Sequence, residues 1–219
     1  ILSDHVGLVG DDGKTHHGVL SVPMLMSIPN LTLLAPRDTR QIRQAVRATL
    51  KLDGPCVVQY PKEGIEPYAQ NVTGEPFAVG KWQTLIPGGQ DAVILAYGRM
   101  TQNAIQASEL LVRRGLSVGV IDCCSLKPLD MDCLRALFER KAKIVTIEEG
   151  EMIGGFGSEI ARVCVEENAD APVQIIGLEN RFITHGSVPE LLRECGLMPE
   201  QLADRIEEIA GDKENSHVG

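Results

Sequence analysis

The chain has 219 residues, of which 43% are hydrophobic and 23% are charged, and its formal net charge is -9. These values are typical of a globular protein with room for one large domain or two small ones. Nucleic acids are bound mainly through clustered Lys and Arg, and no such cluster is present, which argues against a nucleic-acid partner. No apolar run approaches the roughly 20 residues needed to cross a bilayer, and no signal-peptide pattern opens the chain. The composition therefore predicts a cytoplasmic protein that has no contact with a membrane.

The cysteines are scattered and show no CxxC spacing; they are Cys56, Cys123, Cys124, Cys133, Cys164 and Cys195. A disulfide framework or a zinc site is therefore not expected, and small buried thiols in a reducing compartment are the preferred interpretation. We expect no metal site in this chain.

The first segments read as strands separated by a polar loop and a helix. Ile1 to Ser3 is typical of the end of a buried strand, and the absence of an initiator Met before it suggests a fragment. A loop from Gly7 to Gly18 carries four glycines with Asp and His side chains, a composition that commonly turns side chains toward a ligand. A buried parallel strand over 31–35 and a helix capped by Asp38 follow. A second strand over 56–60 completes a crossover unit.

Residues 61 to 76 are rich in Pro, Glu and Gly without periodicity, and we interpret them as a linker that ends the first domain. From Lys81 onward strands and helices alternate regularly. Strands are predicted over 92–96, 117–121, 143–147 and 173–176. Helices are predicted over 101–114, after Asp130, after the glycine-rich turn 154–158, after the capping box 187–190, and around Leu202, Ile206 and Ile209. The pattern indicates an α/β fold with a mainly parallel sheet.

Several short motifs occur in a recognisable order. The string Gly-Asp-Asp-Gly-Lys-Thr-His-His-Gly over 10–18 is similar to the G-x-DG-x-TH-x-G segment of the deoxyxylulose-phosphate synthase family, within the transketolase superfamily. Further similar segments are Ser27-Ile-Pro-Asn30, Ala35-Pro-Arg-Asp38, Asp53-Gly-Pro55, Tyr60-Pro61, Lys127-Pro-Leu-Asp130, Glu148-Glu149, Gly154-Gly-Phe-Gly-Ser158 and Phe182-Ile-Thr-His-Gly186. Each segment alone would be weak evidence. The resemblance rests on the order and spacing of all the segments, which together span essentially the whole chain.

The resemblance implies that residues 1–76 are the second half of a pyrimidine-binding domain with its linker, and that residues 77–219 are a transketolase C-terminal domain. Such an enzyme transfers aldehyde or ketone residues with thiamine diphosphate and Mg²⁺. In this family it joins pyruvate to glyceraldehyde 3-phosphate, for isoprenoid precursors and thiamine. The residues that anchor the cofactor would lie in missing N-terminal domains or in a partner subunit, so the chain would be inactive alone. The resemblance also implies a homodimer.

Carried over by position, His16 and Asp12 match the family's acceptor-site His and Asp and are the candidate catalytic residues. A His can donate a proton to a carbonyl oxygen and take one back, and an ionised Asp can accept from a hydroxyl. Lys62 and His5 are the candidate substrate-binding residues. Each stands where the family has a phosphate-binding Arg, and Met26 stands where a further Arg occurs, so a diverged relative with another acceptor fits these departures at least as well.

Two alternatives remain: the C-terminal subunit of a split transketolase, which would use a ketose phosphate as donor, and a non-catalytic dimerisation or regulatory module. Three smaller predictions accompany these. His17 is expected to face solvent, the turn 154–158 to be structural, and the Glu148-Glu149 pair to lie at a contact between subunits.

Overall fold

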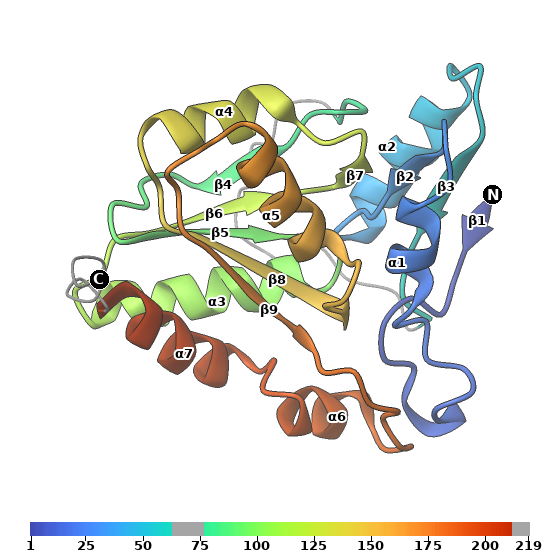
Figure 1. The fold of residues 1–219 in the computed structure, drawn as a ribbon. Coiled ribbons are helices and arrows are strands. Elements are labelled where there is room, and N and C mark those ends of the chain that lie inside the picture. Colours follow the sequence, from blue (N-terminus) through green and yellow to red (C-terminus); the bar gives the residue numbers. More distant parts are fainter. Residues whose placement is uncertain (63–76, 212–219) are drawn as a thin grey trace.

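The computed structural model describes residues 1–62 and 77–211, which form two sheets flanked by helices (Figure 1). The first sheet has the strand order β1-β3-β2-β7 and the second has the order β4-β6-β5-β8-β9. The strands are β1 (Leu2–Ser3), β2 (Thr32–Leu34), β3 (Cys56–Gln59), β4 (Gln83–Ile86), β5 (Ala92–Ala96), β6 (Val118–Asp122), β7 (Ser125–Lys127), β8 (Ile144–Glu151) and β9 (Val173–Leu178). The helices are η1 (Gly10–Asp12), α1 (Ser21–Met26), α2 (Thr39–Thr49), α3 (Met100–Arg113), α4 (Met131–Glu139), α5 (Phe156–Glu166), α6 (Val188–Glu194) and α7 (Pro199–Gly211).

The predicted crossover unit of the first sheet is present. β2 and β3 pair in parallel, with Leu33 opposite Val57, and α2 connects them. The Asp38 carboxylate accepts the Gln41 N–H at 2.7 Å, which satisfies one of the unpaired donors of the first helical turn. β1 lies on the outer side of β3, also in parallel. The prediction that this strand is buried is wrong: β1 is an edge strand, and Leu2 is 58% exposed.

The second sheet is parallel except for β4, which pairs with β6 in the antiparallel direction. Helices cover both of its faces (Figure 1). Along β5 the side chains alternate: Ile94 packs into the cluster that includes α3 and α7, while Leu95 packs into the cluster that includes α4 and α5. Burial of one such side chain contributes about 1.5 to 3 kcal/mol, so this double layer is the main stabilising feature of the domain.

A strand from the second part of the chain completes the first sheet. β7 pairs with β2 in the antiparallel direction, and the Ala35 N–H donates to the Cys124 carbonyl at 2.9 Å. The Lys127 ammonium group donates to the carbonyls of Met26, at 2.8 Å, and Ile28, at 2.5 Å. The two sheets are therefore joined by main-chain pairing as well as by side chains.

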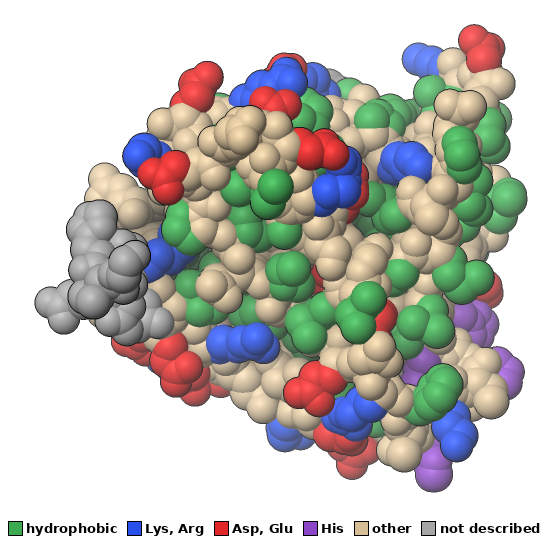
Figure 2. Space-filling view, viewed as in Figure 1, with side chains coloured by type: hydrophobic (Ala, Val, Ile, Leu, Met, Phe, Trp, Pro, Cys, Tyr) green, Lys and Arg blue, Asp and Glu red, His purple; other side chains and the backbone are tan. Residues whose placement is uncertain are grey.

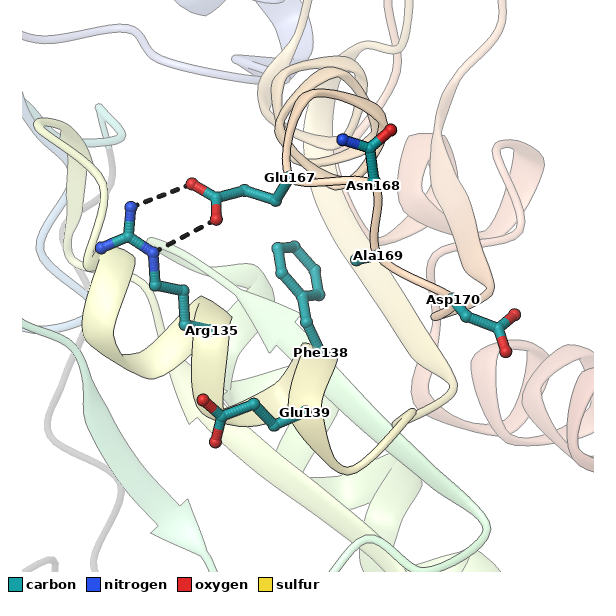
Figure 3. Close-up of a pocket in the computed structure, with 7 residues that line it drawn as sticks. All are labelled: Arg135, Phe138, Glu139, Glu167, Asn168, Ala169 and Asp170. Carbon is teal, nitrogen blue, oxygen red and sulfur yellow. Dashed lines mark hydrogen bonds and ion pairs between the residues drawn. The ribbon is translucent and has the colours of Figure 1, made fainter.

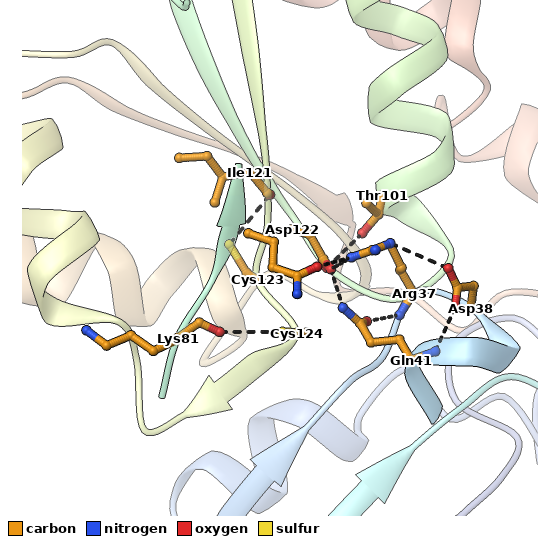
Figure 4. A network of polar contacts seen from close by, with 10 residues as sticks. Arg37, Asp38, Gln41, Lys81, Thr101, Ile121, Asp122, Cys123 and Cys124 are labelled. Atoms are coloured by element: carbon orange, nitrogen blue, oxygen red, sulfur yellow. Dashed lines mark hydrogen bonds and ion pairs between the residues drawn. The ribbon is translucent and has the colours of Figure 1, made fainter. Parts of the chain in front are cut away.

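A buried polar network lies at the same junction (Figure 4). Arg37, which follows β2, forms an ion pair with Asp122, the last residue of β6, and donates to Gln83 at 2.7 Å. The Gln41 amide donates to the Asp122 carboxylate at 2.6 Å. Asp122 is 0% exposed, and burial raises the pKa of its carboxyl group, so the Arg37 cation is what makes its ionised form tolerable there.

The predicted helices and parallel strands of the second part are confirmed, with ends that differ by a few residues. The structure adds α1, β4 and β7, which the sequence patterns did not predict. The predicted linker and domain boundary fall largely on residues 63–76, which lie outside the described residues, so the boundary stays a prediction.

None of the helices in the described part of the chain has both the length and the apolar character that crossing a bilayer requires.

Candidate functional site

The candidate site is built on the loop between β1 and α1. The base of the loop closes on itself, because the Gly18 N–H donates to the Gly7 carbonyl at 2.9 Å. A short turn, η1, begins at Gly10 and carries Asp12, and Gly13 follows with a φ of 75°, in the region that favours glycine. Histidine side chains gather over this loop, at the lower right of Figure 2.

Three of the predicted site residues, Lys62, His16 and His5, lie within electrostatic reach of the fourth, Asp12. Asp12 and Lys62 form an ion pair, although they stand 50 positions apart in the chain. The Lys62 ammonium holds the pKa of the Asp12 carboxyl below its usual range, and His16 and His5 act in the same direction. The loop after β1 and the residues after β3 thus bring one carboxylate, one ammonium and two imidazoles to one solvent-open surface.

The two histidines of this group have different surroundings. The His16 side chain is exposed, and its Nδ1 lies 3.0 Å from the Thr15 hydroxyl. His5 is partly buried, lies 3.1 Å from the Asp4 carboxylate, and adopts a φ of 59°. His16 is therefore free to meet a small molecule from solvent, whereas His5 is already engaged by a neighbouring carboxylate.

His17 is partly buried, so the prediction that it faces solvent holds only in part. Its Nδ1 accepts the Val9 N–H at 3.1 Å, and its Nε2 lies 3.0 Å from the Thr184 carbonyl oxygen. Thr184 lies 167 residues further along the chain, so local sequence could not indicate this contact.

The Glu149 carboxylate is used inside the chain, and its predicted place at a contact between subunits stays a prediction. Its Oε1 accepts the Leu8 N–H at 2.8 Å and lies 3.4 Å from the Arg99 guanidinium. A Cβ added to Gly7 would lie 2.6 Å from the Glu149 Cδ, which is too short for a real contact. The Glu149 carboxyl group therefore packs directly against the backbone of the loop. A residue of β8 in the second sheet thereby supports the loop that carries Asp12 and His16.

The glycine-rich turn 154–158 is structural, as predicted, and the group that accepts hydrogen bonds at the start of its helix is the carboxyl of the neighbouring Glu148. The Glu148 carboxylate accepts the Phe156 N–H at 3.0 Å and the Gly157 N–H at 2.9 Å, at the N-terminus of α5. Burial raises the pKa of Glu148 to about 7 in spite of these two donors. Glu148 is 0% exposed, so it has no access to a substrate.

Two of the hollows on the described surface bear on the search for a ligand site. One adjoins the loop and is lined by Lys14, His17, Val19, Leu20, Glu151, Asn180, Arg181, Phe182 and Ile183. The other lies between α4 and the end of α5, where Arg135 and Glu167 form a two-point ion pair at 2.9 and 3.3 Å (Figure 3). Because this second hollow is open and its one cation, Arg135, is already paired with Glu167, we assign it no ligand.

The residues present do not form a Mg²⁺ site of the kind that holds a diphosphate. Over residues 1–62 and 77–211, no group of three His, Cys, Asp or Glu side chains could hold a metal ion. What the loop offers is a proton donor and acceptor in His16, a carboxylate in Asp12 and a cation in Lys62. This set suits recognition of an anionic, hydroxylated carbonyl compound.

Comparison with known proteins places this geometry in a family. Residues 1–66 match the family model of the transketolase pyrimidine binding domain, and residues 80–202 match that of the transketolase C-terminal domain. The chain is 38% identical over 197 residues to the 1-deoxy-D-xylulose-5-phosphate synthase of Thermus thermophilus, covering 90% of this chain and 31% of the relative. It is also 38% identical over 213 residues to that of Geobacillus thermodenitrificans, covering 96% and 34%. The chain thus spans about a third of these relatives and is homologous to their carboxy-terminal portion.

Solved structures agree with this assignment. A structure described as a split gene transketolase, inactive beta4 tetramer, superimposes with a TM-score of 0.84 and 28% identity, covering 96% of this chain and 66% of that one. A transketolase from Pichia stipitis superimposes with a TM-score of 0.72 over 94% of this chain and 29% of that chain, and its 20% identity shows the shared fold alone. The order of the two sheets, the domain matches and these likenesses lead to one conclusion: the chain belongs to the transketolase family.

Proposed function

We propose that this chain supplies the acceptor side of a thiamine-diphosphate-dependent transferase that joins a two-carbon unit from pyruvate to a phosphorylated aldehyde such as glyceraldehyde 3-phosphate. The observation that carries the proposal is the meeting of Asp12, His16 and Lys62 at one open surface, in a chain 38% identical to synthases of this reaction class. The chain would work as part of a larger enzyme, called the complete enzyme below.

In this proposal each residue has a separate task. Lys62 contacts the phosphate of the aldehyde, because an ammonium group is a compact cation with three donors. His16 donates a proton to the aldehyde oxygen as that oxygen becomes an alkoxide, and it takes a proton back in the reverse direction. Asp12 accepts from a hydroxyl group of the acceptor and keeps Lys62 in place between turnovers.

The cofactor would be held outside this chain. Since the described residues offer no metal cluster, thiamine diphosphate and its Mg²⁺ would be anchored by a diphosphate-binding domain or a partner subunit, and we assign them no residue here. Calorimetry of the 219-residue chain with thiamine diphosphate and Mg²⁺ should therefore detect no tight binding. A micromolar dissociation constant would show that the chain itself holds a cofactor site.

A second candidate is the C-terminal subunit of a split transketolase, which is favoured by the structural match to the split gene transketolase. The two candidates differ in the donor substrate. The complete enzyme should be assayed with pyruvate and with a ketose phosphate as alternative donors, each with glyceraldehyde 3-phosphate as acceptor. Carbon dioxide release from pyruvate with formation of a five-carbon product supports the first proposal. Turnover with the ketose phosphate as donor, and none with pyruvate, supports the second.

A further inference from the structure

The surroundings of His17 specify one form of its imidazole ring. A backbone N–H can only donate, so the 3.1 Å contact from Val9 requires an unprotonated Nδ1 that accepts. A carbonyl oxygen can only accept, so the 3.0 Å contact to Thr184 requires a hydrogen on Nε2. One neutral tautomer, with its hydrogen on Nε2, satisfies both partners. The other neutral tautomer, with its hydrogen on Nδ1, and the doubly protonated ring would each point an N–H at the N–H of Val9.

This ring connects the candidate catalytic loop to the C-terminal domain. Val9 precedes η1, which carries Asp12, and His17 follows His16 directly. Thr184 lies between β9 and α6. The ring therefore bridges the two ends of the loop to each other and, through the Thr184 carbonyl, to a segment that belongs to the second sheet's domain.

Two further contacts fix the same loop from the same side. The Glu149 carboxylate accepts the Leu8 N–H at 2.8 Å, and the Glu151 N–H donates to the Val19 carbonyl at 3.0 Å. Both glutamates belong to β8. Two contacts from β8 thus hold the ends of the loop, and His17 ties the same ends to each other and to Thr184.

We propose that His17 is a positioning residue: as the Nε2-protonated tautomer, it ties the loop bearing Asp12 and His16 to the Thr184 carbonyl and so sets where these two side chains meet the acceptor. The proposal rests on the proposed function for its effect on catalysis, but the tie itself does not depend on any activity. It gives the C-terminal domain a role in the site, through the Thr184 carbonyl.

Two substitutions separate hydrogen bonding from mere packing. His17→Gln keeps one acceptor and one donor on the side chain, whereas His17→Leu keeps the bulk and removes both. In the complete enzyme, His17→Leu should lower kcat by roughly 10- to 100-fold, the range expected when reacting groups are displaced by about 1 Å. His17→Gln should restore most of that loss. His185→Leu makes the same chemical change at an exposed histidine of the neighbouring segment and should leave kcat unchanged.

A second measurement needs no turnover. In the 219-residue chain, amide hydrogen exchange at Val9 should be slow in the wild type and in His17→Gln and much faster in His17→Leu. Nitrogen-15 spectra of the wild-type imidazoles should show His17 with its hydrogen on Nε2. This spectrum also decides the question if His17→Leu does not fold, since a ring protonated on Nδ1 would contradict the assignment.

The outcomes distinguish this proposal from the proposed function. If the complete enzyme does not join pyruvate to an aldehyde at all, the proposed function fails, and the Val9 exchange and the imidazole spectrum still test the tie. If the wild-type enzyme is active and His17→Leu keeps its kcat within about twofold while Val9 exchanges freely, the tie exists without positioning the site and the proposal is overturned. Equal losses in His17→Leu and His17→Gln would likewise count against it.

Discussion

The four candidate side chains meet because of the order of the strands. β1 and β3 are parallel neighbours, with Ser3 opposite Gln59, so the loop after β1 and the turn after β3 leave the same edge of the sheet. Ligand-binding groups commonly lie at that edge in parallel sheets. A sequence that predicts the two strands and their direction therefore predicts that Asp12 and Lys62 come close.

The supporting residues could not be predicted in the same way. His17 stands in a polar loop without periodicity, and its partner Thr184 is 167 residues away. Glu149 follows Glu148 in a strand, and only the fold decides that one carboxylate is buried against the start of α5 while the other accepts the Leu8 N–H. Contacts of this kind depend on how the loop is packed, which local patterns do not encode.

Glu148 gives a prediction for the pH dependence of stability. Its pKa is raised by burial from an ordinary value of 4.5 to about 7, so the folded state retains a proton that the unfolded state has lost. The stabilising contribution is therefore complete below pH 4.5 and is lost as the pH rises through about 7. We expect the difference in unfolding free energy between wild type and Glu148→Gln to fall by up to roughly 3 kcal/mol over that interval.

Urea unfolding of both proteins at pH 4 to 8 measures this difference. Glu167→Gln is the control, because Arg135 lowers the pKa of Glu167 and its contribution should change with pH in the opposite direction. A difference between wild type and Glu148→Gln that does not change with pH would contradict the assignment of a protonated, buried Glu148.

At the scale of elements, helix starts were predicted well because their signals are local. Asp38 and Asp130 accept backbone N–H groups three residues ahead, and Ser187 donates its own N–H to Glu190 at 3.0 Å. The short edge strands β4 and β7 were missed, since each pairs in the antiparallel direction with a distant strand and shows little alternation of its own. α1 was missed because six residues including Pro23 show no helical period.

The junction between the two sheets is predicted to depend on Arg37. Replacing Arg37 by Met leaves the Asp122 carboxylate buried without its cation, and we expect a loss of about 3 to 5 kcal/mol in unfolding free energy. The double substitution Arg37→Met with Asp122→Asn should recover part of this loss, because no unpaired charge then remains and the Gln41 amide keeps an acceptor.

Urea unfolding of the chain again provides the measurement. Arg162→Met is the matched control, because Arg162 is 50% exposed and pairs with Glu159 on the helix surface, where about 0 to 1 kcal/mol is expected. If Arg37→Met costs no more than Arg162→Met, the network does not join the sheets as described.

At the scale of the whole molecule, one surface carries several exposed apolar side chains. Met24 is 68% exposed on α1, Leu20 is 47% exposed just before it, and Phe182 is 80% exposed in the segment that contacts the loop. Figure 2 shows hydrophobic side chains over α1 on this side of the molecule. Exposed apolar side chains of this kind are common at contact sites, and we propose that this surface takes part in the homodimer that the resemblance implies.

We expect sedimentation of the chain at micromolar concentration to show a dimer or a larger species. Met24→Glu should shift the equilibrium toward monomer, whereas Val165→Glu, a matched change at a 76% exposed side chain on α5, should not. A monomer throughout the concentration range would show that this surface does not suffice for association.

The central claim, that the loop after β1 and the turn after β3 recognise a phosphorylated aldehyde, is tested most directly by steady-state kinetics of the complete enzyme. Lys62→Ala should raise KM for the phosphorylated aldehyde by roughly 10- to 100-fold with a smaller effect on kcat, because a remote charge-assisted contact worth about 1.5 to 3 kcal/mol acts mainly in binding. His16→Ala should instead lower kcat, since its proton is needed as the alkoxide forms. An unchanged KM in Lys62→Ala, together with equal turnover of unphosphorylated aldehydes, would contradict the account.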